Sequence, residues 1–341
     1  MLAVFDGHND ALTRTDHARI ATGRSSGHVD VPRMRAGGMR GGIFAVFTPS
    51  SRMRKTPLRR RGGVLEFKPA SPVDHRRAAA HATAAAGRLL AMDRTGSMRV
   101  ARDIAAVDAA KVDDGPPVAV LHLEGAEAID PALESLDAWY AAGLRSLGPA
   151  WSRPNAFAHG VPFRFPSSPD TGPGLSAAGR ELVERCAELG ILVDVSHLNE
   201  AGFWDIARLE VGPLVASHSG VHALAASSRN LTDAQLDAIA ASGGLVGIVF
   251  ACAFLRADFA DDPDTPLQLI VDHARYVAER IGVAHVALGS DFDGATVPTE
   301  LGDASGLPRL VTALGEAGFA PDEVAAIAWE NWRRVLAAWW S

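Results

Sequence analysis

The hydrophobic positions of this chain fall into short apolar runs separated by longer amphipathic stretches. The runs are rich in Val, Leu, Ile and Ala, as buried strands are. They lie at 2–6, 43–48, 117–124, 144–149, 191–196, 213–217, 244–250 and 285–290. Ala- and Leu-rich stretches with helical spacing predict helices at 73–92, 175–189, 200–209, 232–241 and 265–282. An alternation that reaches eight strands predicts an α/β fold, a single (β/α)₈ barrel of the TIM type over residues 1–341.

Three regions interrupt the alternation, at 50–72, 152–174 and 251–266. Each is too long and too rich in Pro, Gly or Arg for a tight connection, and long loops in compact domains are often functional. The region 50–72 carries an Arg cluster from Arg52 to Arg61. For this region, the alternative to a functional loop is a mobile excursion into solvent. The terminal segment WENWRRVLAAWW predicts a helix that packs its tryptophans on the outside of the barrel.

Composition narrows the class of protein. Hydrophobic residues make up 48% and charged residues 21% of the 341 residues, which fits a globular enzyme. The net charge of −7 argues against nucleic acid as a partner, and no apolar run reaches the roughly 20 residues that span a bilayer. Cys186 and Cys252 sit in apolar segments, so we expect no disulfide and a cytoplasmic location, although a mature chain that had lost a signal would look the same.

Metal-capable side chains follow four of the apolar runs, which read VFDGHND, VAVLHLEG, ILVDVSHL and PLVASHSG. The candidate ligands are His8, Asp10, Glu124, His197 and His218. Singly, each has a structural alternative, such as a turn or a hydrogen-bonded core histidine. Strand ends of a barrel meet at one rim, however, and imidazole and carboxylate ligands together suit a divalent metal of the zinc type. A carboxylate bridging two cations would also explain why Glu124 ends a buried strand.

Further polar residues follow other strands. Asp291 directly follows the eighth strand and could take a proton from a metal-bound water and pass it to a leaving amine. Arg229 and Asn230 follow the sixth strand, where the arginine offers a planar fork for a substrate carboxylate; a surface salt bridge is the alternative. His122 is interpreted as a core residue or one that supports the ligands, and Asp293 as a residue that shapes the turn.

The chain resembles the membrane (renal-type) dipeptidase family, the dinuclear zinc peptidases of the amidohydrolase superfamily. The resemblance rests on segments in the family's order over nearly the whole length: DGHND (6–10), LEGAEAI (123–129), GLRSLG (143–148), GLSAAGRELV (174–183), VDVSHL (193–198), SHSGVHALAASSRN (217–230) and GSDFDG (289–294). It implies two Zn²⁺ per chain, one on His8 and Asp10, one on His197 and His218, with Glu124 bridging. It also implies that Asp291 is the acid/base, that Arg229 holds the substrate's carboxylate, and that the protein is a homodimer.

One departure concerns the substrate. Family members of the renal type carry a substrate-binding histidine after the fourth strand, where this chain has Trp151. Either the metal alone holds the developing oxyanion, or another group such as His159 replaces the histidine. The family's substrate-binding tyrosine after the seventh strand has no clear counterpart near FACAF (250–254).

These observations lead to the hypothesis of a zinc-dependent dipeptidase. A hydroxide shared by the two metals attacks the peptide carbonyl of a dipeptide, and Asp291 shuttles the proton. The first alternative is a related amidohydrolase acting on N-acyl amino acids or lactones, and the second is a non-catalytic metal-binding homologue.

Overall fold

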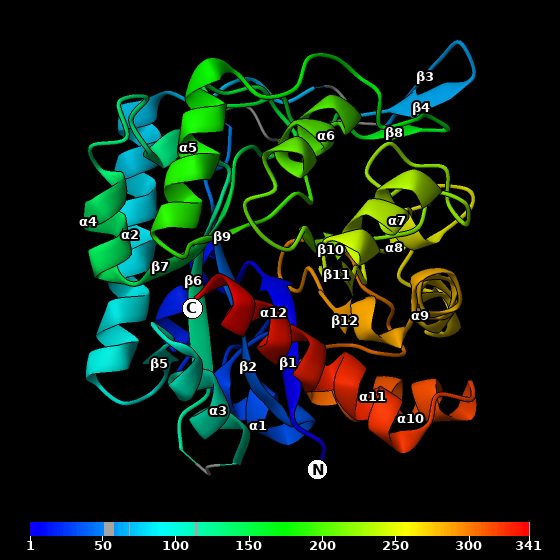
Figure 1. Cartoon of the computed structure of the whole chain (residues 1–341). Coiled ribbons are helices and arrows are strands. Elements are labelled where there is room, and N and C mark those ends of the chain that lie inside the picture. Colours follow the sequence, from blue (N-terminus) through cyan, green and yellow to red (C-terminus); the bar gives the residue numbers. More distant parts are fainter. Residues whose placement is uncertain (51–57, 68, 113–114, 341) are drawn as a thin grey trace.

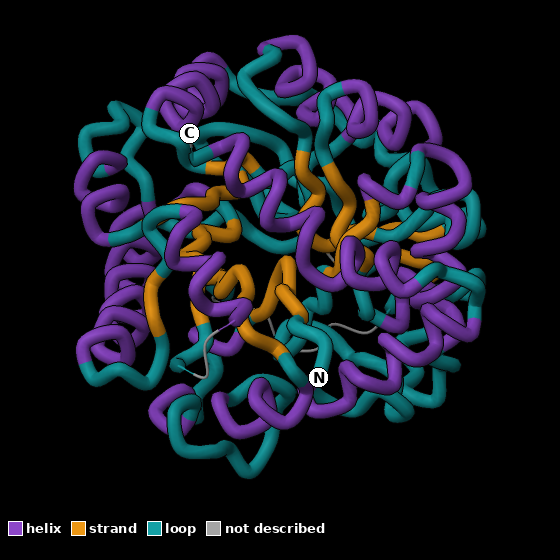
Figure 2. Tube along the Cα trace, turned by 60° about the horizontal axis from the view of Figure 1, so that its bottom comes forward, coloured by secondary structure: helices purple, strands orange, loops and turns teal. Residues whose placement is uncertain are grey.

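A parallel β-barrel surrounded by helices forms the body of the molecule (Figure 1, Figure 2). The structure is a computed structural model that describes residues 1–50, 58–67, 69–112 and 115–340. Within these residues eight strands make up the barrel: β1 (Val4–Asn9), β2 (Met39–Phe47), β6 (Val118–Glu124), β7 (Leu144–Gly148), β9 (Leu192–Val193), β10 (Val215–Ser219), β11 (Leu245–Ile248) and β12 (Val286–Leu288). Each corresponds to one predicted strand, so the predicted (β/α)₈ barrel is confirmed.

Hydrogen bonding joins the barrel strands into two parallel sheets, β1-β2-β6-β7-β9 and β10-β11-β12, and β5 (Arg99–Val100) pairs with the start of β6. The sheets meet through two short parallel contacts, Asp194 with Val215 and Asn9 with Phe292. Because the strands run in the same direction, their C-terminal ends share one rim. The side chains that follow the strands therefore converge there.

Helices cover the outside of the barrel, and they begin where the sequence offers capping side chains. Ser176, Asn199 and Thr232 each accept a hydrogen bond from a backbone N–H of the first turn of α5, α6 and α7. The helices are α1 (Val31–Gly37), α2 (His75–Arg94), α3 (Ile104–Val112), α4 (Leu136–Ala142), α5 (Ala177–Glu188), α6 (Glu200–Leu209), α7 (Asp233–Ala241), α8 (Cys252–Leu255), α9 (Gln268–Ile281), α10 (Leu307–Glu316), α11 (Pro321–Ala325) and α12 (Asn331–Trp339).

Two of the three long excursions meet in a small antiparallel sheet above the barrel rim (Figure 1). Strands β3 (Arg59–Arg61) and β4 (Val64–Glu66) come from the first excursion, and β8 (Arg164–Phe165) comes from the second. The three arginines of β3 are exposed, whereas Arg52 and Arg54 of the predicted Arg cluster lie outside the described residues. Pairing across the two excursions holds them over the rim.

The C-terminal helix α12 closes the joint between β12 and β1, together with the π-helical turn η6 (Ala326–Glu330) that precedes it. Asn331 Nδ2 donates to the carbonyl of Val286, and Trp332 Nε1 donates to the carbonyl of Leu288, both in β12. The Trp332 ring also lies 5.9 Å from the Phe5 ring of β1. The predicted helix is present, and its tryptophan at 332 is fully buried against the strands, where its indole donates to a carbonyl of β12.

Among the described residues, no helix combines the length and the apolar character needed to cross a membrane.

Candidate active site

Five side chains with metal-binding capacity meet at the C-terminal rim of the barrel. His8 lies in β1 and Asp10 follows it, Glu124 ends β6, His197 follows β9, and His218 lies in β10. None of the five is more than 8% exposed. The strand ends therefore bring together in space the five residues that the sequence singled out at separate positions.

Glu124 stands at the centre of this group. Its Oε1 atom lies 2.8 Å from His197 Nε2 and 3.6 Å from both His8 Nε2 and His218 Nε2. His197 Nε2 and His218 Nε2 are 3.0 Å apart, and the rings of His8 and His218 lie 3.7 Å apart. One carboxylate thus faces three imidazole nitrogens, an arrangement that suits a shared metal ligand.

Several of these polar atoms are buried without a protein partner. Both ring nitrogens of His8 and the Oδ1 atom of Asp10 have no hydrogen-bond partner among the described residues. Buried polar groups are costly unless they are paired or bind a metal. Potential ligand atoms within 4.8 Å of one another occur in the group His8, Asp10 and Glu124 and in the group Glu124, His197 and His218. The residues present therefore fit two cations that share Glu124.

Burial sets the protonation of the group in a direction that favours cations. Desolvation lowers the pKa values of His8, His197 and His218 well below their usual 6.5, and neighbouring charged groups add to the effect. These rings are therefore neutral at pH 7, which is the form that binds metals. Desolvation raises the pKa values of Asp10 and Glu124 well above the usual range, and nearby carboxylates raise them further. A divalent cation would bind the neutral imidazoles and would compensate the cost of ionising the two buried carboxylates.

A chain of hydrogen bonds fixes the orientation of His218. Ser217 Oγ donates to Asp194 Oδ2 at 2.5 Å and lies 2.8 Å from His218 Nδ1. Since the hydroxyl has one proton and Asp194 receives it, Nδ1 must carry the proton that it shares with Ser217. The lone pair of His218 is thereby left on Nε2, facing Glu124. Ser152 Oγ lies 2.8 Å from His197 Nδ1, as Ser217 Oγ does from His218 Nδ1.

Replacing Ser217 by alanine is expected to weaken the affinity for a divalent metal by about 10- to 100-fold, the usual effect of removing a group that orients a metal-binding histidine. Competition with a chelator measures the affinity. Ser146→Ala is the matched control, because Ser146 Oγ contacts Nδ1 of His122, which is not one of the five candidates. Equal affinities of the two variants would show that Ser217 has no such role.

Asp291 lies beside the same group on a constrained turn after β12. Its φ is 57°, its N–H donates to the His8 carbonyl at 3.0 Å, and its carboxylate can join a metal-capable group with His8 and His218. Desolvation raises its pKa to about 7 against the opposing effect of Arg229. A carboxyl group with this pKa can both accept and release a proton near neutral pH.

Asp293 holds this turn in place, in agreement with the turn-shaping role expected for it. Its carboxylate accepts hydrogen bonds from Arg24 Nη1 at 2.6 Å and from the His28 N–H at 2.8 Å. The Arg24 and Asp293 side chains are both fully buried.

Arg229 presents a buried positive charge next to the ligand group. Its Nη1 donates to Ser219 Oγ and its Nη2 to the His218 carbonyl, each at 2.9 Å, while Nε has no partner among the described residues. Burial lowers its pKa to about 10, with Asp291 opposing the shift, so the guanidinium keeps its charge at pH 7. The free Nε–H is available for an anion, and a surface salt bridge is excluded because the residue is buried.

A model of the membrane dipeptidase family, peptidase family M19, matches residues 1–339. The chain belongs to the membrane dipeptidase family. A metallopeptidase from Rhodobacter sphaeroides, solved with a phosphinate mimic of the dipeptide L-Ala-D-Ala, is 43% identical, and 99% of each chain is covered at a TM-score of 0.93. Dipeptidase AC, a solved metallopeptidase of family M19, is also 43% identical, with 99% of each chain covered and a TM-score of 0.92.

A further relative is an uncharacterized Klebsiella pneumoniae protein described by its position in the pqqA 5′ region. It is 52% identical over 221 residues, which cover 65% of this chain and 82% of that protein. The family and the two solved metallopeptidases show that this chain is a metal-dependent dipeptidase.

Trp151, Asn230 and His159 are the remaining predicted site residues of the dipeptidase, and they differ in how close they lie to the candidate ligands. The Trp151 ring is 5.7 Å from the His197 ring and so borders the ligand group. The Asn230 amide is engaged by backbone: Oδ1 accepts from the Gly220 N–H, and Nδ2 donates to the carbonyls of Ala225 and Phe254. These bonds indicate that Asn230 holds the loop that carries Arg229. They do not favour the predicted contact of Asn230 with the substrate.

His159 is the predicted residue that the structure does not bring into the group. Its side chain is exposed, and its Nδ1 lies 3.4 Å from the carbonyl of Gly174. Among the described residues its ring makes no hydrogen bond, ion pair or ring contact with the five candidate ligands. Its backbone carbonyl accepts from the Asn199 N–H instead, so the chain passes the site while the ring turns to solvent.

Two carboxylates of this dipeptidase support the site but were not predicted from the sequence. Asp194 accepts from the N–H and hydroxyl groups of both Ser196 and Ser217. Asp6 accepts from the N–H and hydroxyl of Ser290, the residue before Asp291. The signal that could have revealed them is a carboxylate inside the apolar runs VFDGHND and ILVDVSHL, where burial is costly without partners.

Asp6 gives this dipeptidase a measurable pH dependence in the metal-free state. Desolvation raises its pKa to about 7 in the folded protein, against the lowering effect of its hydrogen bonds, whereas in the unfolded chain it titrates near the usual 3.8. Between these values the folded state binds the extra proton, so its stability relative to Asp6→Asn falls as the pH rises from 4 to 7. The expected loss is about 1.4 kcal/mol for each pH unit in this window.

Urea denaturation of both metal-free proteins at several pH values measures this difference. A difference in unfolding free energy that stays constant from pH 4 to 7 would contradict the raised pKa of Asp6.

Proposed function

We propose that this metal-dependent dipeptidase carries two Zn²⁺ ions, one held by His8 and Asp10 and the other by His197 and His218, with Glu124 shared between them. The observation that carries the proposal is the central Glu124 Oε1 atom, which faces three imidazole nitrogens at 2.8 to 3.6 Å. When bound, such a pair of ions supplies a water activated at neutral pH and polarises the peptide carbonyl.

Asp291 is the acid/base of the proposed reaction. Its carboxylate accepts a proton from the attacking water as the new C–O bond forms at the peptide carbonyl. It then returns this proton to the nitrogen of the leaving residue as the C–N bond breaks, and two amino acids result. A pKa of about 7 serves both halves of this task, because the group gains and loses its proton at little cost near neutral pH.

Arg229 fixes the C-terminal end of the substrate. Its unpartnered Nε–H can donate to the substrate carboxylate, and its bonds to Ser219 and to the His218 carbonyl hold the guanidinium in place. Since His218 is itself a proposed metal ligand, its bond to Arg229 fixes the guanidinium directly beside the metal group. A free C-terminal carboxylate is thereby selected at a set distance from the bond that breaks.

Metal analysis and a substrate screen test this function together. We expect about two zinc per chain and turnover of dipeptides in a library of L,L and L,D forms. A value near one zinc per chain would rule out the bridging role of Glu124.

The second candidate, an amidohydrolase acting on N-acyl amino acids or lactones, is favoured by Trp151 standing where the family has a histidine. N-acyl amino acids also carry the carboxylate that Arg229 would bind. Turnover of N-acyl amino acids or lactones without turnover of dipeptides would replace the proposed function by this one.

A further inference from the structure

Three half-buried aromatic rings form a continuous surface beside the site, which we call the aromatic wall: Trp151, Phe163 and Phe254. The Phe163 ring is its centre, 5.5 Å from the Trp151 ring and 5.6 Å from the Phe254 ring. These spacings are those of packed aromatic pairs. The wall is therefore one surface rather than three separate side chains.

Residues of the three long excursions form this wall or support it. Phe163 directly precedes β8 in the second excursion, and Phe254 lies in α8 of the third. Phe67 of the first excursion packs 6.3 Å from Phe163, and the fully buried Phe259 packs 6.2 Å from Phe254. The rings are supported on one side while they remain half exposed, which leaves apolar surface for another group.

The two ends of the wall lie at the two ends of the proposed substrate position. The Arg229 Cζ atom lies 5.9 Å from the Phe254 ring. At the other end the His197 ring lies 6.3 Å from Phe163 and 5.7 Å from Trp151. A dipeptide with its carboxylate on Arg229 and its peptide carbonyl at the metal group has its C-terminal residue between these points, alongside Phe254 and Phe163.

The charged groups near the wall do not favour a charged substrate side chain. Arg153 lies with its Cζ 5.3 Å from the Trp151 ring and its Nη2 has no partner among the described residues, but the residue is 1% exposed and its Nε donates to Glu127 Oε1 at 2.7 Å. A charged side chain placed on the wall would lose hydration, and the buried guanidinium of Arg153 is not exposed to pair with it.

We propose that the aromatic wall receives the side chain of the substrate's C-terminal residue, so that the preferred substrates are dipeptides with an apolar C-terminal side chain. The inference rests on the proposed function, because the positions of the carboxylate and the peptide carbonyl come from it. Burying a leucine side chain on such a surface raises kcat/KM about 10- to 100-fold over glycine at the same position.

The test compares kcat/KM for Ala-Leu, Ala-Gly, Ala-Asp and Ala-Lys, each with both configurations of the C-terminal residue where it has one. The zinc-loaded wild type is expected to prefer Ala-Leu at least about tenfold over the other three. Phe163→Ala is expected to reduce this preference about tenfold with unchanged metal content, whereas Phe163→Leu, which keeps an apolar side chain, should retain most of it.

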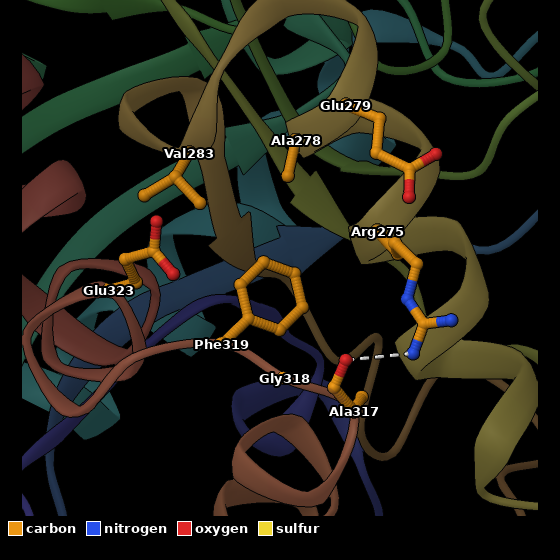
Figure 3. A pocket seen from close by; sticks show the side chains of 8 residues that line it. All are labelled: Arg275, Ala278, Glu279, Val283, Ala317, Gly318, Phe319 and Glu323. Carbon is orange, nitrogen blue, oxygen red and sulfur yellow. Dashed lines mark hydrogen bonds between the residues drawn. The ribbon is translucent and has the colours of Figure 1, made fainter.

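A matched control comes from the opposite end of the strands. A cavity of about 430 Å³ lies between α9 and the connection from α10 to α11, and Phe319 lines it (Figure 3). Phe319→Ala also removes a phenyl ring, but this ring lies near Val283, just before β12. The variant should therefore leave the preference for Ala-Leu intact. If Phe163→Ala does not fold, Trp151→Ala tests the same wall from the start of the connection between β7 and β8, and it too should reduce the preference.

Two results would overturn the inference: a wild type without preference for Ala-Leu, or a preference that survives in folded Phe163→Ala or Trp151→Ala. Failure of the proposed function has a different signature, since zinc-loaded wild type would then cleave none of the dipeptides. Cleavage of all four at similar kcat/KM leaves the dipeptidase function standing and removes only the role of the wall.

Discussion

Asp291→Asn is expected to lower kcat by roughly 10³-fold, within the range found for general acid–base groups, while the enzyme keeps its metal. Asparagine has nearly the same shape but cannot carry the proton between water and leaving amine. It also tolerates the left-handed backbone conformation, so the φ of 57° at this position should be kept. Steady-state kinetics with metal analysis of the same sample measure the effect.

The control for Asp291→Asn is Asp261→Asn, the same exchange in the third excursion, where the carboxylate accepts from the Thr296 hydroxyl at an exposed position. We expect it to retain wild-type kcat. Full dipeptide turnover by metal-loaded Asp291→Asn would show that another group moves the proton. Loss of metal from this variant would instead assign Asp291 to metal binding with His8 and His218.

Glu124→Gln is expected to reduce the metal content from about two to one or fewer and to lower kcat/KM by roughly 10³-fold, equivalent to about 4 kcal/mol of transition-state stabilisation. The amide keeps the volume of the side chain but lacks the negative charge that two cations would share. Its NH₂ group would also oppose one of the surrounding imidazole nitrogens, which lie 2.8 to 3.6 Å from Oε1. Metal analysis after gel filtration and kinetics at saturating metal measure the two effects.

Glu188→Gln provides the comparison for Glu124→Gln, because Glu188 is an exposed carboxylate paired with Arg185 on the surface of α5. Surface pairs of this kind contribute little, so its metal content and activity should match the wild type. A Glu124→Gln enzyme that binds two metals with unchanged affinity would remove Glu124 from its proposed bridging role.

The strands and the five candidate ligands could be predicted because they depend on local patterns. A short apolar run that ends in His, Asp or Glu is visible in the sequence, and parallel strand ends must meet at one rim of a barrel. That physical constraint brings Glu124 and His218 together without any knowledge of the loops. The structure places the imidazoles of His8, His197 and His218 around one oxygen of Glu124, which the sequence pattern alone does not specify.

Loop positions were predicted less well, because a loop residue's direction depends on which partners its backbone and side chain find. Asn230 was placed at the substrate, yet its amide is engaged by backbone groups of two loops. His159 was offered as a substitute for the family's histidine, yet its ring is exposed.

The sequence by itself determined the barrel, the dipeptidase family and the residue types at the strand ends, because hydrophobic periodicity and short motifs are properties of neighbouring positions. Only the tertiary structure decided the relay from Asp194 through Ser217 to His218, the free Nε of Arg229 and the aromatic wall. The relay and the aromatic wall join residues from separate βα units, and the Nε of Arg229 is left free by the bonds that its other nitrogens make to β10. Their distances are set by how the strands close and how the three excursions pack, so they appear only when the whole chain is folded.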